Sequence, residues 1–269
     1  MSRNILTFAC FLFNLRRYIP GRLDGTFWEE EPMALLLAAA LIGLVVFIHE
    51  LGHYIAARMT GTPVETFGIG FGPALVERSL WGTKWRIGCI PLGGYVKMEL
   101  PEDATRVFKN TAIVLAGPAM NFLLAFICLI GACLLQDMSI SEAVARAWQG
   151  LGLATDATLH AFGKLLSLSS AEDFQGPVGM VSSIKGIIVD QGIGFAKFLV
   201  LVGVISFGLG FMNLIPVPPL DGGKFVFLWL RLLAPRFMKT AELVVRATGA
   251  LALFAFLIFV TFKDVIKLF

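Results

Sequence analysis

Four long apolar runs dominate the pattern of hydrophobic and polar positions along this 269-residue chain. They cover residues 33–57, 111–135, 198–220 and 243–262. A helix of roughly 17–25 apolar residues is long enough to cross the hydrocarbon core of a bilayer. The pattern therefore predicts an all-α polytopic membrane protein with four transmembrane helices and a single domain over residues 33–269.

The segment between the first two runs, residues 62–100, has a different pattern. β-Branched and aromatic residues recur in it, residues 85–90 alternate in part, and glycines interrupt it. Such a pattern is typical of a β-hairpin. Because the segment is too apolar for an ordinary loop, we expect a small hairpin with an edge strand that dips into the membrane. Its backbone would there be buried in protein or line a wet cavity.

Two segments outside the apolar runs carry weaker signals. Residues 1–32 form an N-terminal extension whose apolar stretch is too short to span a membrane and is followed by Arg16 and Arg17. Because no small-residue cleavage site follows, we expect an interfacial amphipathic helix rather than a signal peptide. In the loop at residues 136–197 we predict a helix over residues 141–166 and then a glycine-rich connection.

The composition supports a membrane protein and excludes most soluble classes. Charged residues make up 15% of the chain, against roughly 25% in soluble domains, and the mean hydropathy is +0.80. The net charge of +3 is small and scattered, whereas a nucleic-acid partner needs a clustered basic face. We therefore expect the lipid bilayer, and no nucleic acid, as a partner.

The distribution of Lys and Arg predicts the orientation of the chain. Basic residues are frequent between the first two runs and in the short connection between the last two, but sparse in residues 136–197. By the positive-inside rule, the two basic loops face the cytoplasm. Both termini and the loop at 136–197 are then non-cytoplasmic, although Arg16 and Arg17 act against this orientation.

The end of the first apolar run carries the pentapeptide His49-Glu50-Leu51-Gly52-His53. On a helix, residues i and i+4 share a face, so both imidazoles can bind one metal ion. The adjacent Glu50 can then act as a general base, which is the zinc-hydrolase arrangement. The alternative is a set of polar residues that cap the helix at the interface. A charge inside a membrane helix costs about 2.5–3.5 kcal/mol on insertion scales, which favours a functional role.

A catalytic zinc ion needs a third protein ligand and an open position for water. The candidate is Asp221, which follows three closely spaced prolines at the end of the third run. Such a helix break is tolerated at membrane depth only beside a wet cavity, where it can deliver a carboxylate to a metal. An exposed turn is the alternative, but the pairing with an intramembrane His49 and His53 favours a ligand. We therefore predict one zinc ion per chain.

Two motifs together carry a resemblance to a known family. His-Glu-Leu-Gly-His at 49–53, with Asn-x-x-Pro-x-Pro-x-Leu-Asp-Gly at 213–222, resembles the site-2 protease family of intramembrane zinc metalloproteases. Glycine-containing stretches at residues 68–72, 91–98 and 116–121 are similar to those of the bacterial branch, which cleaves anti-sigma factors and signal-peptide remnants. The resemblance extends from about residue 34 to the C-terminus.

The resemblance implies a role for each matching residue. His49, His53 and Asp221 would bind zinc, and Glu50 would activate the attacking water molecule. Asn213 would hold the substrate backbone or the oxyanion, as a side-chain amide can. The alternative for Asn213 is a hydrogen bond between helices.

Four further residues are candidate substrate contacts. Asn121 has a role in substrate binding or in packing. Gly93, Gly94 and Tyr95 belong to the expected edge strand, which could capture an unwound substrate segment by strand addition. The alternative for this hairpin is that it only plugs the site.

The resemblance implies an intramembrane zinc endopeptidase that acts on transmembrane segments of other membrane proteins. Its site would lie near the cytoplasmic face of a bacterial inner membrane. Members of the best-known branch carry PDZ domains between the second and third spans, but residues 136–197 leave little room for one. The alternative is a zinc-binding membrane protein without proteolysis, either a transporter or an inactive scaffold, for which Glu50 would have no purpose.

Overall fold

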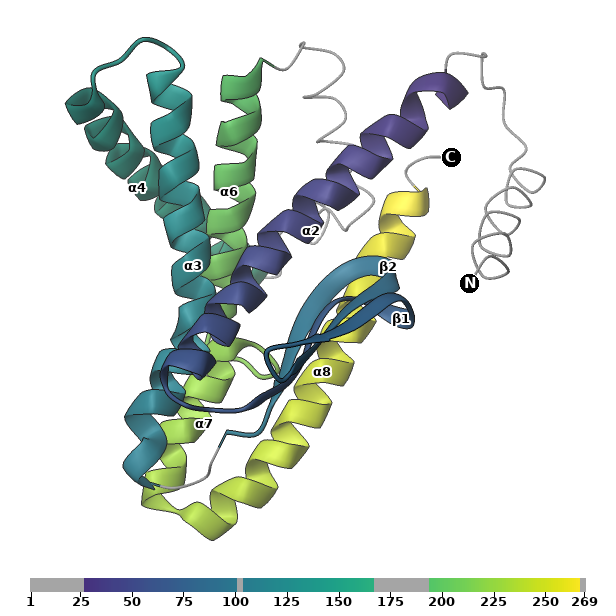
Figure 1. Ribbon diagram of the computed structural model, residues 1–269, viewed down its shortest axis with the longest axis vertical. Coiled ribbons are helices and arrows are strands. Elements are labelled where there is room, and N and C mark those ends of the chain that lie inside the picture. The colour runs from purple at the N-terminus through teal and green to yellow at the C-terminus, as the bar shows by residue number, and fades with distance from the viewer. Residues whose placement is uncertain (1–26, 101–103, 167–193, 267–269) are drawn as a thin grey trace.

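The computed structural model describes residues 27–100, 104–166 and 194–266 of the chain (Figure 1). Six helices occur in this part, α2 (Phe27–Met59), α3 (Val107–Leu134), α4 (Ile140–Leu166), α6 (Phe195–Leu214), α7 (Asp221–Leu233) and α8 (Pro235–Ile266). Two strands, β1 (Val64–Leu80) and β2 (Thr83–Met98), lie between α2 and α3 in the chain. A short 3-10 turn, Ala104–Arg106, precedes α3.

Four of these helices are long and apolar enough to cross a membrane, and their candidate spans are Ala40–Met59, Val107–Leu134, Phe195–Leu214 and Glu242–Lys263. The predicted fold class is confirmed, since the structure is mostly helical with a small sheet between the first two spans. The third span ends at Leu214 rather than at residue 220. Ile215 is already extended, and Pro216, Pro218 and Pro219 cannot donate the backbone hydrogen bonds that would continue the helix.

Some expectations fall wholly or partly outside the described residues. The interfacial helix expected within residues 1–32 lies outside them over residues 1–26. Phe27–Pro32 are described and form the first turns of α2. Two further expectations, a glycine-rich connection and too little room for a PDZ domain, involve residues 167–193, which also lie outside the described residues. The helix predicted at 141–166 corresponds to α4, whose start is fixed by Ser139 and Glu142. Each side chain bonds the other's backbone N–H, at 3.4 and 3.1 Å, which is a capping box.

The first and third spans, α2 and α6, both pack against the second span, α3. Small residues permit this close approach, as is common between membrane helices. A Cβ at Gly52 of α2 would overlap the carbonyl oxygen of Ala116 in α3, and one at Gly210 of α6 would lie 3.1 Å from the carbonyl oxygen of Pro118. The His-containing end of α2 is therefore held directly against the middle of α3.

The sheet is built from two long, bent antiparallel strands. Residues 66–69 of β1 pair with residues 94–97 of β2 on one side and with residues 84–87 on the other. The remainder of β1 continues as a hairpin that turns at Trp81 and Gly82, both with positive φ. Residues 94–98, hereafter the edge segment, have strand partners on one side only among the described residues.

The inner end of the sheet is anchored on α2 by an aromatic cluster. Phe67 is 1% exposed and lies between Phe47 and Tyr54 of α2 and Trp85 of β2. The outer hairpin, by contrast, is exposed along β1 beyond residue 70. Burial thus fixes the edge segment near α2 while the hairpin tip projects away from it (Figure 1).

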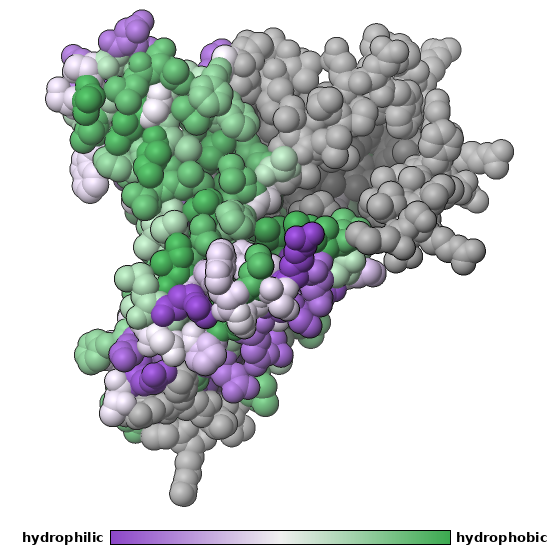
Figure 2. All heavy atoms as spheres, in the orientation of Figure 1, coloured by the Kyte–Doolittle hydropathy of each residue, from purple (hydrophilic) through white to green (hydrophobic). Residues whose placement is uncertain are grey.

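The surface of the helical bundle is largely apolar. Figure 2 shows hydrophobic residues over the region of α3, α4 and α6, with hydrophilic residues gathered lower on the same face. Large side chains on the spans, such as Leu123, Ile127 and Val204, are half or more exposed. A contiguous apolar surface of this kind is unusual in a soluble monomer, and it agrees with spans that face lipid.

We expect Gly52→Ala to destabilise the protein, because the added methyl group would overlap the Ala116 carbonyl and force α2 away from α3. The expected loss in the free energy of unfolding is about 1–3 kcal/mol, measured by denaturant titration in detergent. Gly43→Ala on the same helix is the matched control, since a Cβ there meets no atom within 4 Å. Equal stabilities of the two variants would contradict the close α2–α3 packing.

Candidate metal centre

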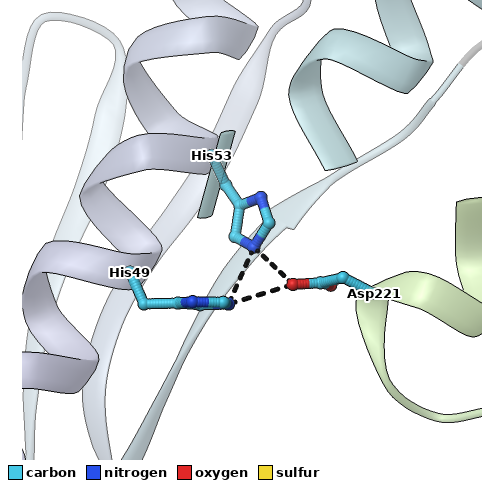
Figure 3. Close-up of side chains that lie close together, drawn as sticks. All are labelled: His49, His53 and Asp221. Carbon is cyan, nitrogen blue, oxygen red and sulfur yellow. Dashed lines mark hydrogen bonds and ion pairs between the residues drawn. The ribbon is translucent and has the colours of Figure 1, made fainter. Parts of the chain in front are cut away.

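Two imidazoles from the last turns of the first span form one half of the site. His49 and His53 lie one helical turn apart on α2, and their exposed fractions are 5% and 7%. Their Nε2 atoms are 3.2 Å apart and point toward the same place (Figure 3). The spacing of the motif on an uninterrupted helix produces this convergence.

Asp221 completes the group from the other end of the chain. The proline-containing turn after α6 ends at Leu220, and Asp221 is the first residue of α7. Its Oδ2 atom lies 3.0 Å from His49 Nε2 and 3.1 Å from His53 Nε2. The residue is 3% exposed, so the structure brings the three predicted ligands together in a buried place.

The spacing of these three atoms fits a zinc ion. Ligand atoms in tetrahedral coordination at bond lengths of about 2.0–2.1 Å are about 3.3 Å apart, close to the observed 3.0–3.2 Å. Two imidazole nitrogens and one carboxylate oxygen also form a donor set typical of catalytic zinc, in which a fourth position is left for water.

Hydrogen bonds on the far side of each ring orient the imidazoles. His53 Nδ1 lies 2.8 Å from the carbonyl oxygen of Ile113, to which it can only donate, so Nε2 is left as the metal-binding atom. His49 Nδ1 lies 3.4 Å from the side-chain amide nitrogen of Asn121, whose own Oδ1 has no partner among the described residues. Rotating that amide by about 180° would let Oδ1 accept from His49 Nδ1–H and satisfy both groups.

A glycine on α3 provides the space that a metal ion needs. A Cβ at Gly117 would overlap His53 Nε2 and would lie 2.8 Å from His49 Nε2. Any larger residue would therefore occupy the place toward which both nitrogens point. The space beside the two nitrogens, together with the donor set, supports a metal ion at the three side chains.

The metal centre opens into a cavity of about 460 Å³. Glu50 lies in its wall, beside His49, and a Cβ at Gly94 would be 2.9 Å from Glu50 Cγ. The edge segment therefore passes immediately next to Glu50, and its residues Tyr95, Val96 and Met98 also line the cavity. One cavity thus holds the candidate ligands, a candidate base and a strand edge.

The predicted substrate contacts divide into two groups. Asn213 lines the cavity, and its amide nitrogen donates to the carbonyl oxygen of Leu209 in its own helix, at 2.9 Å. Gly94 and Tyr95 line it as well. Gly93 and Asn121 are not among the described residues that do so. Asn121 is fully buried behind His49, and Gly93 takes a positive φ next to the Phe71 ring.

Three charged residues that the sequence did not identify as site residues also line the cavity, Arg231, Glu242 and Arg246. Glu242 of α8 is 6% exposed and accepts hydrogen bonds from Arg231 of α7 at 2.7 Å and from Arg246 at 3.4 Å. The i, i+4 spacing of Glu242 and Arg246 was visible in the sequence, but the pairing across to Arg231 was not.

Lys224 lies nearer to the metal centre, and its Nζ atom is 2.9 Å from Asp221 Oδ1. Burial acts to raise the pKa of Asp221, but hydrogen bonds with His49 and His53 and the Lys224 cation outweigh it. The pKa of Asp221 therefore lies well below its ordinary value, which favours the carboxylate form that a metal ligand needs.

The sequence was compared with known proteins. A family model described as Peptidase family M50 matches residues 37–256. A predicted zinc metalloprotease of Campylobacter jejuni is 25% identical over 90% of this chain and 95% of its own length. One from Fusobacterium nucleatum is 24% identical over 88% of this chain and 100% of its own length. One from Clostridium acetobutylicum is 27% identical over 86% of this chain and 97% of its own length.

We expect Gly117→Ala to abolish stoichiometric zinc binding, because the methyl group would occupy the place between the two Nε2 atoms. The zinc content of purified protein, measured by elemental analysis, should fall from about one ion per chain to background. Gly131→Ala is the control on the same helix, since its Cβ meets only the end of the Leu199 side chain, at 3.1 Å. A Gly117→Ala protein with full zinc content would refute this placement of the ion.

Proposed function

The chain belongs to peptidase family M50, and we propose that it is an intramembrane zinc endopeptidase, which hydrolyses peptide bonds within transmembrane segments of other membrane proteins. One observation carries the proposal. The buried group of His49, His53 and Asp221 lies at the end of a candidate span and shares a cavity with Glu50. Anti-sigma factors and signal-peptide remnants are the substrate types that we propose.

The residues present divide the work of hydrolysis. His49, His53 and Asp221 would hold a zinc ion, which would act as a Lewis acid and make the attacking water molecule more acidic. The Glu50 carboxylate accepts a proton from the attacking water and passes it to the leaving amine. Its position in the cavity wall, rather than among the ligands, leaves it available for this transfer.

Asn213 is suited to hold the substrate carbonyl group. Its amide nitrogen carries two hydrogens, and the bond to the Leu209 carbonyl uses one of them. We propose that the second donates to the substrate backbone or to the developing oxyanion. The other amide of the predicted set, that of Asn121, instead orients His49 from behind.

We propose that the edge segment captures the substrate by strand addition. A transmembrane helix hides its amides in i to i−4 hydrogen bonds, so it must be unwound before a peptide bond can be attacked. The edge segment has a free side among the described residues and runs next to Glu50. A substrate strand paired there would present its backbone to the base and the metal centre.

We also propose an inner-membrane location with the active site near the cytoplasmic face. The sheet and α7, which begins with Asp221, lie toward one end of the molecule, away from α4 (Figure 1). That end contains the two loops rich in Lys and Arg, which favour the cytoplasmic side. The relatives compared above come from bacteria, which agrees with a bacterial inner membrane.

We expect Glu50→Gln to retain zinc and to cleave a tagged single-span substrate at least about 100-fold more slowly than wild type, because it lacks the general base. Cleavage is followed by gel electrophoresis of purified protein in detergent, with zinc content measured on the same samples. Glu77→Gln on the exposed hairpin, where Glu77 pairs with Lys84, is the control. Unchanged cleavage by Glu50→Gln would contradict the assigned base, and a zinc-loaded wild type without any cleavage would favour a transporter or scaffold.

Strand addition predicts a specific neighbour for the edge segment. In a cysteine-free Glu50→Gln background, we expect Val96→Cys to form a disulfide with cysteines placed along the cleaved stretch of a substrate. Ser79→Cys is the control, because Ser79 is exposed and lies on the outer hairpin of the same sheet. Equal cross-linking from both positions, or none from Val96→Cys, would contradict capture by the edge segment.

A further inference from the structure

The two oxygens of Asp221 have different partners. Oδ2 faces the two imidazole nitrogens at 3.0 and 3.1 Å, while Oδ1 accepts a hydrogen bond from Lys224 Nζ at 2.9 Å. The carboxylate side chain is 4% exposed, whereas that of Lys224 is 40% exposed and lines the cavity. The lysine therefore reaches the buried ligand from the cavity side.

The first turn of α7 places Asp221 and Lys224 close enough for this contact. Asp221 and Lys224 are three residues apart on the helix, so their side chains lie on one face. The two glycines between them hold the turn tightly beneath the proline-containing segment. A Cβ at Gly222 would overlap backbone oxygens of Leu214 and Ile215, and one at Gly223 would lie 2.5 Å from Pro218 N. The backbone of Asp221 is thus fixed, and the orientation of its carboxylate depends on the partners of its two oxygens.

We infer that Lys224 is a positioning residue that holds Asp221 to a single-oxygen contact with the metal ion. This inference rests on the zinc site of the proposed function. A carboxylate can bind a metal ion through one oxygen or through both. Because the ammonium group binds Oδ1, only Oδ2 is left for the metal ion, and the coordination position that catalysis needs for water stays open.

Lys224 could instead weaken zinc binding, which is the opposite of what a positioning role predicts. A cation near a metal site repels the ion, so a lysine without a positioning role would weaken zinc binding, and its removal would strengthen it. A lysine that orients a ligand has the reverse signature, since loss of such an outer partner typically lowers metal affinity by about 10–100-fold.

The experiment measures zinc affinity on the full-length protein in detergent, by competition with a chelator, for wild type, Lys224→Met, Lys224→Gln and Lys224→Arg. We expect both neutral variants to bind zinc about 10–100-fold more weakly and Lys224→Arg to restore the affinity. Lys84→Met, which removes the exposed ion pair with Glu77, should leave it unchanged. Unfolding temperatures of the metal-free proteins identify any variant whose loss of affinity follows from misfolding.

Cobalt(II) substitution gives a second readout that does not depend on activity. If the freed carboxylate binds through both oxygens, the visible absorption of the cobalt protein should lose intensity in Lys224→Met, as expected for a higher coordination number. Lys224→Arg should keep the spectrum of wild type. The inference would be overturned if both neutral variants bound zinc as tightly as wild type or more tightly and kept its cobalt spectrum. Wild type without zinc binding would overturn the proposed function itself.

Discussion

Ionisable side chains that are buried among apolar surroundings need a partner or a metal ion, and the contact of His49 and His53 with Asp221 meets this constraint. The contact joins the end of the first span to the start of α7 and so connects distant parts of the chain. Removing any one of the three would deprive the other two of a buried polar contact. The site is for that reason both the chemical centre of the protein and a structural link between its elements.

α3 serves as the frame of the site. Its backbone carbonyl at Ile113 orients His53, its Asn121 side chain lies behind His49, and its Gly117 leaves space beside both nitrogens. These residues recur at spacings of about one turn, so they share the face that packs on α2. The small residue Gly52 brings that face close enough for contact, which is how helix packing controls the geometry of the imidazoles.

The cavity is the place where the proposed hydrolysis would occur at membrane depth. Non-helical backbone is tolerated there only where it is buried in protein or lines a wet space. The edge segment and the turn that contains Pro218 and Pro219 are such backbone, and both border the cavity at the metal centre. The Glu242 ion pair with Arg231 joins α7 to α8, and both residues line the same cavity. Irregular elements thus gather where water is required, and regular helices face the lipid.

The sequence by itself determined the four spans and the sheet between the first two, and it singled out His49, His53 and Asp221 as candidate ligands. Long apolar runs, an i, i+4 spacing and a proline-broken helix each have a local physical meaning. Only the tertiary structure decided that α6 ends at Leu214, that Asn121 faces His49 rather than the cavity, and that Lys224 and Gly117 adjoin the metal centre. The direction of a side chain depends on how helices cross and how closely they approach, and neither is contained in a local pattern of residues.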